Sequence, residues 1–195
     1  NITINHMDPN ILNKLDALKN EYYRNNTKTH FFKNAQKNEC ASAVANQIDL
    51  QTLFHNTIYI LPNSNHLFFD YTVFKNYANV HNMTEIVQYT MSIFNHLITQ
   101  YNTFIFHVNM DTYSITSHER FKQIYPMFFD ACSMANIDFN KHISVMHIYN
   151  SPKVLTTLSA FFSNFIGNQQ IQDVNIYNKV ESKYLLEKLI HNTTI

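Results

Sequence analysis

The chain contains 11 histidines, a residue type that can bind metals and transfer protons. A metal centre or a metalloprotease site needs such side chains at a fixed spacing, as in HExxH or paired Cys and His ligands, and none of these spacings occurs. His107 and His147 lie in the middle of two apolar segments that we expect to form neighbouring strands. Side by side, their rings can bind a polar head group or a proton. The alternative is a pair of hydrogen-bonded histidines in a core or pocket wall.

A hydrolase triad is the second chemistry to consider, because Asp111, Ser114 and His118 follow one another closely. Their order and spacing match no nucleophile elbow, and the chain contains no G-x-S-x-G. The single glycine, Gly167, also excludes G-x-G-x-x-G and P-loop motifs for nucleotide phosphates. We therefore predict a protein that is not an enzyme, with no catalytic residue, no metal and no cofactor.

The two cysteines, Cys40 and Cys132, lie far apart and belong to no CxxC or metal-ligand spacing. We interpret them as reduced thiols in a cytosolic type of compartment, with Cys132 on a buried helix face. No apolar run reaches the roughly 18–20 residues of a membrane span, and the first residues show no signal-peptide pattern. The expected location is therefore intracellular, in the cytoplasm.

The charge pattern narrows the class of partner. The formal net charge is zero, and only Arg24 and Arg120 are arginines. Nucleic-acid binding requires a dense basic surface that displaces counterions, so we predict no nucleic-acid partner. Electrostatic attachment to an anionic membrane is equally weakly supported, although transient contact with a membrane is compatible with the sequence.

The composition favours a folded domain. Apolar residues make up 45% of the chain, with 16 Phe and 12 Tyr, and burial of one Phe contributes roughly 1.5–3 kcal/mol. The abundance of Asn, Ile, Tyr, Phe and Lys is also the bias of AT-rich codons. It is consistent with a source such as a large DNA virus or an AT-rich protist.

Two regions differ in their pattern. Residues 1–50 are polar and rich in Asn, and we predict a helical appendage there, with a helix around Ile11 to Leu18 started by Asp8-Pro9, a loop at 25–38 and a short helix at 40–48. Residues 51–195 alternate between β-branched or aromatic runs and amphipathic segments, and we predict one α/β domain. Its expected strands are 57–61, 67–74, 103–110, 143–149 and 173–177, and its expected helices are 84–101, 116–135, 153–166 and 181–190.

Local signals set several of these boundaries. Pro62 to Asn65 has turn chemistry and predicts a hairpin between the first two strands. Thr116 and Glu119 form a T-x-x-E capping box, and Pro126 indicates a kink or a late start in the helix that follows. Gly167 stands where a left-handed helix cap is expected.

The segment ISVMHIYNSPKVLTTLSAFFSNFIG (143–167) combines an apolar strand, an N-x-P turn and an aromatic-rich helix. It resembles the signature of the CRAL-TRIO lipid-binding family. FIFHVNMDTYSIT (104–116) and IQDVNIYNKVESKYLLEKLI (171–190) resemble that family's preceding strand and its closing strand and helix. The likeness covers roughly residues 57–190, and departs from the family where Asp111-Thr112-Tyr113-Ser114 replaces a glycine. It implies a CRAL-TRIO-like fold, a mixed and mostly parallel β-sheet covered by amphipathic helices.

The resemblance also implies a function: non-enzymatic binding or transfer of a phospholipid, fatty acid or isoprenoid in an apolar cavity, beneath a gate helix at 153–166. Spacing alone fits an ordinary core helix there equally well. The ligand-binding residues it implies are Leu155, Leu158, Phe161, Phe162, Phe165, Phe106, His107, His147 and Tyr149. The alternative function is that of a scaffold with the same fold and no ligand, which binds protein partners in a larger assembly or a virion.

Overall fold

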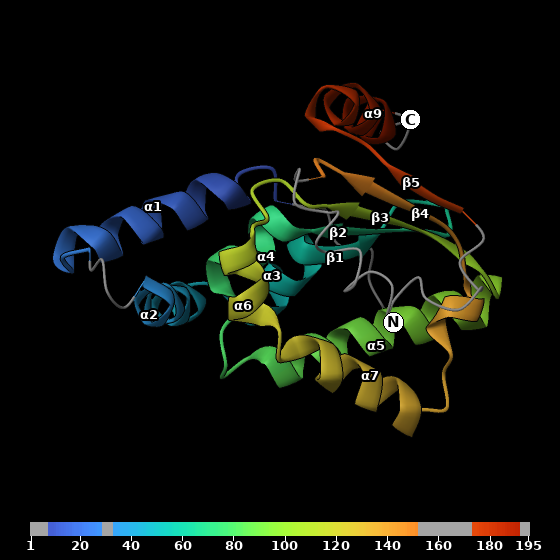
Figure 1. The fold of residues 1–195 in the computed structure, drawn as a ribbon, viewed down its shortest axis with the longest axis horizontal. Helices are drawn as coiled ribbons and strands as arrows, with labels where there is room; N and C mark the ends of the chain where they lie inside the picture. Colours follow the sequence, from blue (N-terminus) through green and yellow to red (C-terminus); the bar gives the residue numbers. More distant parts are fainter. Residues whose placement is uncertain (1–7, 29–32, 152–172, 192–195) are drawn as a thin grey trace.

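The computed structural model describes residues 8–28, 33–151 and 173–191 (Figure 1). Within these ranges the chain forms one five-stranded sheet, whose strands lie side by side in the order in which they occur along the chain. They are β1 (Ile58–Ile60), β2 (His66–Asp70), β3 (Phe104–Asn109), β4 (Ile143–Tyr149) and β5 (Asp173–Ile176). β1 pairs antiparallel with β2, and every other neighbouring pair is parallel. The protein is therefore an α/β protein with a mixed, mostly parallel sheet.

Helices precede, connect and follow these strands. They are α1 (Ile11–Asn25), α2 (Lys33–Ala45), α3 (Leu50–Thr57), α4 (Tyr71–Tyr77), α5 (Met83–Tyr101), α6 (Ile115–Phe121), α7 (Ile124–Met134) and α9 (Lys179–His191), with a short 3₁₀ turn η1 (Phe139–Lys141) before β4. Figure 1 shows α5, α6 and α7 on one face of the sheet and α9 on the other. This follows from the strand order, because successive right-handed crossovers between sequential parallel strands place their helices on the same face.

The hairpin predicted before the parallel strands is confirmed, but its second strand is shorter than the prediction. The strand predicted for 67–74 ends at Asp70, and the chain continues directly as α4. Oδ1 of Asp70 accepts a hydrogen bond from the backbone N–H of Thr72 at 2.8 Å and so caps the helix. Val73 and Phe74 are buried in the core. Capping and burial together outweigh the strand propensity of these β-branched and aromatic residues.

The predicted helix after β3 consists of two helices, α6 and α7, which are separated by two residues. Ser114 caps α6 by accepting from the backbone N–H of Ser117 at 3.3 Å. The predicted capping box at Thr116 and Glu119 is therefore wrong. Pro126 lies in the first turn of α7, where a missing N–H costs no helical hydrogen bond, so the predicted late helix start is confirmed.

The N-terminal residues contain more helix than predicted. The predicted loop at 25–38 is wrong in its second half, because α2 begins at Lys33. The α3 helix was not predicted. Oδ2 of Asp49 caps it by accepting a hydrogen bond from the backbone N–H of Thr52 at 2.8 Å. Leu15 and Val44 are buried in the same hydrophobic core as α4 and the sheet. Residues 8–28 and 33–45, predicted as an appendage, therefore share one core with the residues that follow.

The remaining predicted elements fall close to their observed bounds. The α5 helix and the strands β3, β4 and β5 agree within a residue or two, and α9 begins two residues before the predicted start. The predicted helix at 153–166 and its stop at Gly167 lie outside the described residues.

Candidate functional site

An apolar cavity of about 180 Å³ lies between the sheet and the helices that cover one of its faces. Four strands (β1 to β4), the helices α4 to α7 and the turn η1 contribute its wall, together with segments between them, and nearly every side chain in it is aliphatic or aromatic. The lining residues are Ile58, Phe69, Tyr71, Phe74, Ile86, Val87, Thr90, Phe94, Phe106, Val108, Met110, Tyr113, Phe121, Ile124, Tyr125, Phe128, Phe139 and Met146.

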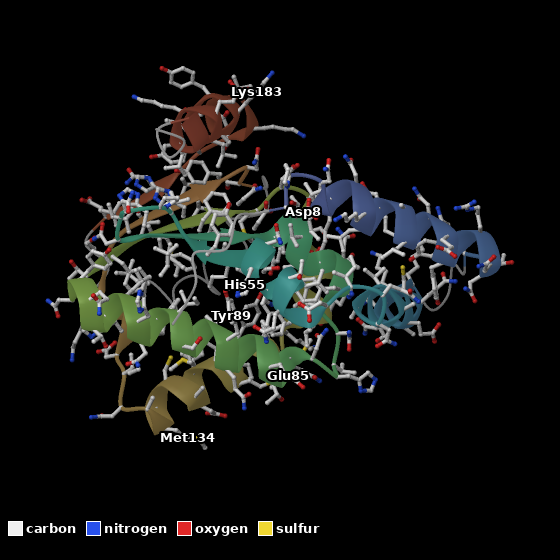
Figure 2. The ribbon with its side chains drawn as sticks, turned by 180° about the vertical axis from the view of Figure 1, so that it is seen from behind. Asp8, His55, Glu85, Tyr89, Met134 and Lys183 are labelled. Atoms are coloured by element: carbon white, nitrogen blue, oxygen red, sulfur yellow. The ribbon has the colours of Figure 1, made fainter. Side chains whose placement is uncertain are left out.

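Two periodicities build this wall. On β3, side chains alternate between the faces of the sheet, so Phe106 and Val108 both face the helices. On α5, Ile86, Val87 and Thr90 lie within one turn of each other and share a face. Next to the cavity, Tyr89 donates a hydrogen bond to the carbonyl of Ile58 at 3.3 Å, and Figure 2 shows it where α5 approaches His55 of α3.

The polar atoms of the wall are already hydrogen-bonded. The Oγ1 of Thr90 donates to the carbonyl oxygen of Ile86 at 2.8 Å, and the hydroxyl oxygens of Tyr113 and Tyr125 lie 2.9 Å apart. Burial raises the pKa of Tyr71 to about 12 and also raises that of Tyr125, so both stay neutral. The cavity therefore offers a guest dispersion contacts and exclusion of water, and none of the described residues in its lining is charged.

The opposite face of the sheet carries a second, very different cluster. His66, His107 and His147 form a stack, one ring on each of β2, β3 and β4. The centroids of His66 and His107 lie 5.1 Å apart and those of His107 and His147 lie 4.9 Å apart, with the planes within 16° and 13° of parallel. We call these three residues the histidine stack.

Hydrogen bonds tie the histidine stack to its neighbours. Nδ1 of His66 and Nε2 of His107 lie 2.9 Å apart, and Nδ1 of His107 lies 2.9 Å from the hydroxyl of Tyr149. His147 uses its Nδ1 to contact the hydroxyl of Tyr177 at 2.9 Å. His107 is 3% exposed and has both ring nitrogens engaged, so the neutral ring donates one bond and accepts the other.

Burial disfavours a positive charge in this stack. It lowers the pKa of His107 to about 3, with further contributions from His147 and His66. Burial also lowers the pKa values of His66 and His147, and for His147 the charge of His66 adds to the effect. The three rings are therefore neutral at pH 7.

The predicted site residues divide between these two places. Phe106 lines the cavity, whereas His107, His147 and Tyr149 lie on the other face of the sheet, away from it. His107 and His147 lie side by side, as expected, because their strands pair in register. The predicted gate-helix residues Leu155, Leu158, Phe161, Phe162 and Phe165 lie outside the described residues.

Sequence reasoning missed most of the cavity and one member of the stack. The helix predicted for 84–101 supplies Val87 and Phe94 to the cavity wall, whereas its last residue, Tyr101, is 48% exposed. His66 follows the hairpin turn, and only the register of β2 against β3 shows that it reaches His107. Periodicity can identify buried faces, but it does not reveal where packed faces leave a void.

A polar cluster at the carboxyl ends of the parallel strands is closed on itself. Nδ2 of Asn150 donates to Oδ1 of Asn109 at 2.9 Å, and Nδ2 of Asn109 donates to Oδ1 of Asp70 at 3.2 Å. Open α/β sheets bind ligands at this edge where the strand order reverses. Here the order is sequential, and the amides link the ends of three strands.

The three residues considered for a hydrolase have separate roles. Ser114 caps α6, Nδ1 of His118 lies 3.3 Å from the hydroxyl of Tyr113, and Asp111 lies 3.8 Å from Nζ of Lys179. Within the described ranges, no group of three or more His, Cys, Asp or Glu side chains has an arrangement that could hold a metal ion. None of the helices in the described part of the chain is long and apolar enough to cross a membrane.

Comparison of the chain with protein-family models, curated proteins and solved structures finds no match.

Proposed function

We propose that this protein binds a hydrophobic ligand in the cavity between its sheet and helices α5 to α7, without covalent chemistry. The observation that carries the proposal is the described lining of the cavity, which is almost entirely aliphatic and aromatic, with the hydroxyls of Thr90, Tyr113 and Tyr125 already hydrogen-bonded. Each CH₂ group transferred from water into such surroundings contributes about 0.8 kcal/mol. An apolar guest is therefore favoured over a polar one.

The size of the cavity narrows the ligand class. Pockets for drug-sized molecules have volumes of roughly 300–1,000 Å³, whereas an apolar cavity of about 150 Å³ accepts benzene. At about 180 Å³, the cavity suits a compact apolar molecule or the end of a fatty-acid, phospholipid or isoprenoid chain. In the last case the head group would remain outside the cavity.

The likeness to CRAL-TRIO domains belongs to the same proposal. The mostly parallel sheet and the apolar cavity beside it support that assignment, as does the strand that ends at Tyr149, directly before Asn150-Ser151. The proposal takes the family's non-enzymatic, cytoplasmic lipid binding as its model.

The test is native mass spectrometry of the purified full chain, followed by organic extraction and by incubation with liposomes of mixed phospholipids, fatty acids and prenols. We expect a bound apolar species, or its stoichiometric uptake from the liposomes. An apo mass that persists after incubation would overturn the proposal.

A matched pair of variants tests whether the ligand binds in this cavity. Val87→Phe adds a ring to a lining residue that is 6% exposed, whereas Val80→Phe makes the same change at a residue that is 56% exposed. We expect Val87→Phe to reduce ligand occupancy at least tenfold and Val80→Phe to retain it. Equal occupancy in the two variants would show that the ligand binds elsewhere.

A scaffold that binds a protein partner is the second candidate. Val180 and Tyr184, one turn apart on α9, are 84% and 67% exposed. Patches of exposed apolar side chains mark sites of protein–protein interaction. For a scaffold, we expect native mass spectrometry to show an apo mass that persists after incubation with liposomes. We also expect the substitutions Val180→Asp and Tyr184→Asp to abolish binding of the protein partner.

A further inference from the structure

The histidine stack runs across β2, β3 and β4, and one end of it lies next to β5, the edge strand of the sheet. His147 is the member nearest that edge, since it pairs in register with Asn175 of β5 and contacts the hydroxyl of Tyr177. The rings of His147 and Tyr177 also stack, with centroids 5.8 Å apart and planes 12° from parallel. A change of charge on His147 therefore acts directly on the segment that begins with β5.

The groups that face the stack offer little compensation for a positive charge. Its neighbours are uncharged rings: Tyr149 and Tyr177 contact His107 and His147, and Phe68 stacks on His107. The strands β2 and β5 carry the acidic residues Asp70 and Asp173, and α9 carries Glu181 together with Lys179 and Lys183. Among the described residues, no ion pair includes any of the three histidines. Protonation therefore places charge among rings about 5 Å apart, against neutral neighbours.

The β5 strand is short and lies at one edge of the sheet. β5 has four residues, two of them exposed, and β4 is its one neighbour in the sheet. Besides that ladder, the backbone of Tyr177 bonds to Ile148 and Ser151, and its ring contacts His147 and Tyr149. The α9 helix is linked through the bond from the Asn150 N–H to Oγ of Ser182 and through the ion pair of Lys179 with Asp111. Short edge elements of this kind open at a lower free energy than a packed core.

We propose that the histidine stack is an acid-sensitive latch, which holds β5 and α9 on the sheet at neutral pH and releases them when the medium is acidified. His147 is partly buried against Tyr177, so its protonated ring is hydrated more fully when Tyr177 moves away, and that movement takes the start of the β5–α9 segment with it. The cavity face of the sheet is buried independently by α5 to α7, so the release precedes global unfolding.

The direction of the pH effect follows from the lowered pKa values. The held state keeps His66 and His147 neutral below the pH at which a solvated histidine, with a pKa of about 6.5, takes up its proton. The released state therefore binds more protons, and its population grows as the pH falls through about 6.5. One histidine that stays neutral in the held state shifts the equilibrium by about tenfold at pH 5.5.

Hydrogen–deuterium exchange on the full chain tests the latch. We expect exchange in residues 173–191, corrected for the intrinsic pH dependence, to speed up at least tenfold between pH 7.5 and pH 5.5. Exchange in α5 should change less than threefold. An unchanged corrected rate in residues 173–191, or an equal acceleration in α5, would overturn the proposal.

The variant that separates titration from structure is the double substitution His66→Asn and His147→Asn. The amide nitrogen or oxygen of Asn can take the place of Nδ1, which is the atom each histidine uses in its hydrogen bond, but Asn carries no titratable proton. We expect the acceleration at pH 5.5 to disappear in this variant and to persist in His81→Asn, at an exposed position. Persistence in the double variant would contradict the latch.

A titration of the wild-type protein covers the case in which the double variant does not fold. Proton NMR should show three histidine rings, those of the histidine stack, that remain neutral until β5 and α9 are released. If His66 and His147 instead titrate near pH 6.5 with no change in residues 173–191, the latch is wrong.

Discussion

Arg120 on α6 donates a hydrogen bond from Nη2 to the carbonyl oxygen of Ala78, the residue that ends α4, at 2.9 Å. Its Nη1 donates to the carbonyl oxygen of Lys75 at 3.0 Å, and its Nε donates to Oδ1 of Asn38 on α2 at 2.8 Å. The last carbonyls of a helix have no partner within it and carry partial negative charge. One guanidinium therefore satisfies the end of α4 and joins α2, α4 and α6.

Removal of this side chain should destabilise the fold. We expect Arg120→Ala to lower the free energy of unfolding by about 2–4 kcal/mol, because several hydrogen bonds to a charged donor are lost and their acceptors remain half-buried. Urea denaturation followed by circular dichroism measures the change. The other arginine, Arg24, is exposed near the end of α1, and Arg24→Ala should cost less than about 1 kcal/mol. Similar losses in the two variants would contradict the bridging role of Arg120.

The aromatic cluster around Phe94 should be equally sensitive. Its ring lies between 5.2 and 6.2 Å, centroid to centroid, from the rings of Phe104, Phe106, Phe128 and Phe139. We expect Phe94→Ala to cost about 3–5 kcal/mol, since it removes buried surface and enlarges the cavity. Tyr101→Ala on the same helix, at a residue that is 48% exposed, should cost less than about 1 kcal/mol. Thermal unfolding of both variants gives the comparison.

Asp70 combines a helix cap with a buried carboxylate, and these two roles can be separated. Burial raises the pKa of Asp70 above its usual value of 3.8, so ionisation costs stability as the pH rises through 3.8 toward the raised value. Asn keeps the capping oxygen without the charge. We expect the stability of Asp70→Asn relative to wild type to increase between pH 3.5 and pH 7, whereas Asp70→Ala should lose about 1–2 kcal/mol at pH 7.

The measurement for Asp70 is chemical denaturation at several pH values, with the difference between variant and wild type taken at each one. This difference removes the contribution of the histidines, which is common to all three proteins. A difference that stays constant between pH 3.5 and pH 7 would show that the carboxyl of Asp70 titrates normally.

The two thiols should be protected in the folded protein. Cys40 and Cys132 are 5% and 4% exposed, and burial raises the pKa of Cys132 to about 11 and also raises that of Cys40. The thiolate is the reactive form, so we expect reaction with Ellman's reagent at pH 8 to be at least a hundredfold slower in the native protein than in 6 M guanidinium. Rapid reaction of one thiol in the native state would show that its helix opens locally.

The strands were the most predictable part of the fold. The predicted bounds of β4 agree with the structure, because a continuous apolar run is followed at once by Asn150, which has a left-handed backbone with φ of 52°. The misplaced elements depend on contacts distant in sequence. Tyr71 to Phe74 have strand propensity, yet they form a helix whose buried side includes rings of Tyr71 and Phe74 packed against Phe121 of α6.

The candidate sites were predictable only in part, for a similar reason. The pairing of His107 with His147 follows from two neighbouring parallel strands, which the pattern predicted. The positions of His66 and Tyr177 in the same cluster depend on strand register, and a shift of one residue would move them to the other face. The cavity is harder still to predict from the sequence, because it forms where the side chains of α5, α7 and the sheet leave a space between them.

The sequential strand order has a consequence for the synthesis of this protein. Each strand after the first adds to the outer edge of those already made, so no strand has to insert between two that precede it. The hairpin of β1 and β2 offers an edge to β3 as soon as β3 has left the ribosome, and β3 then offers one to β4. The sheet can therefore grow in step with translation, and each new helix covers the strands beneath it before the next strand arrives.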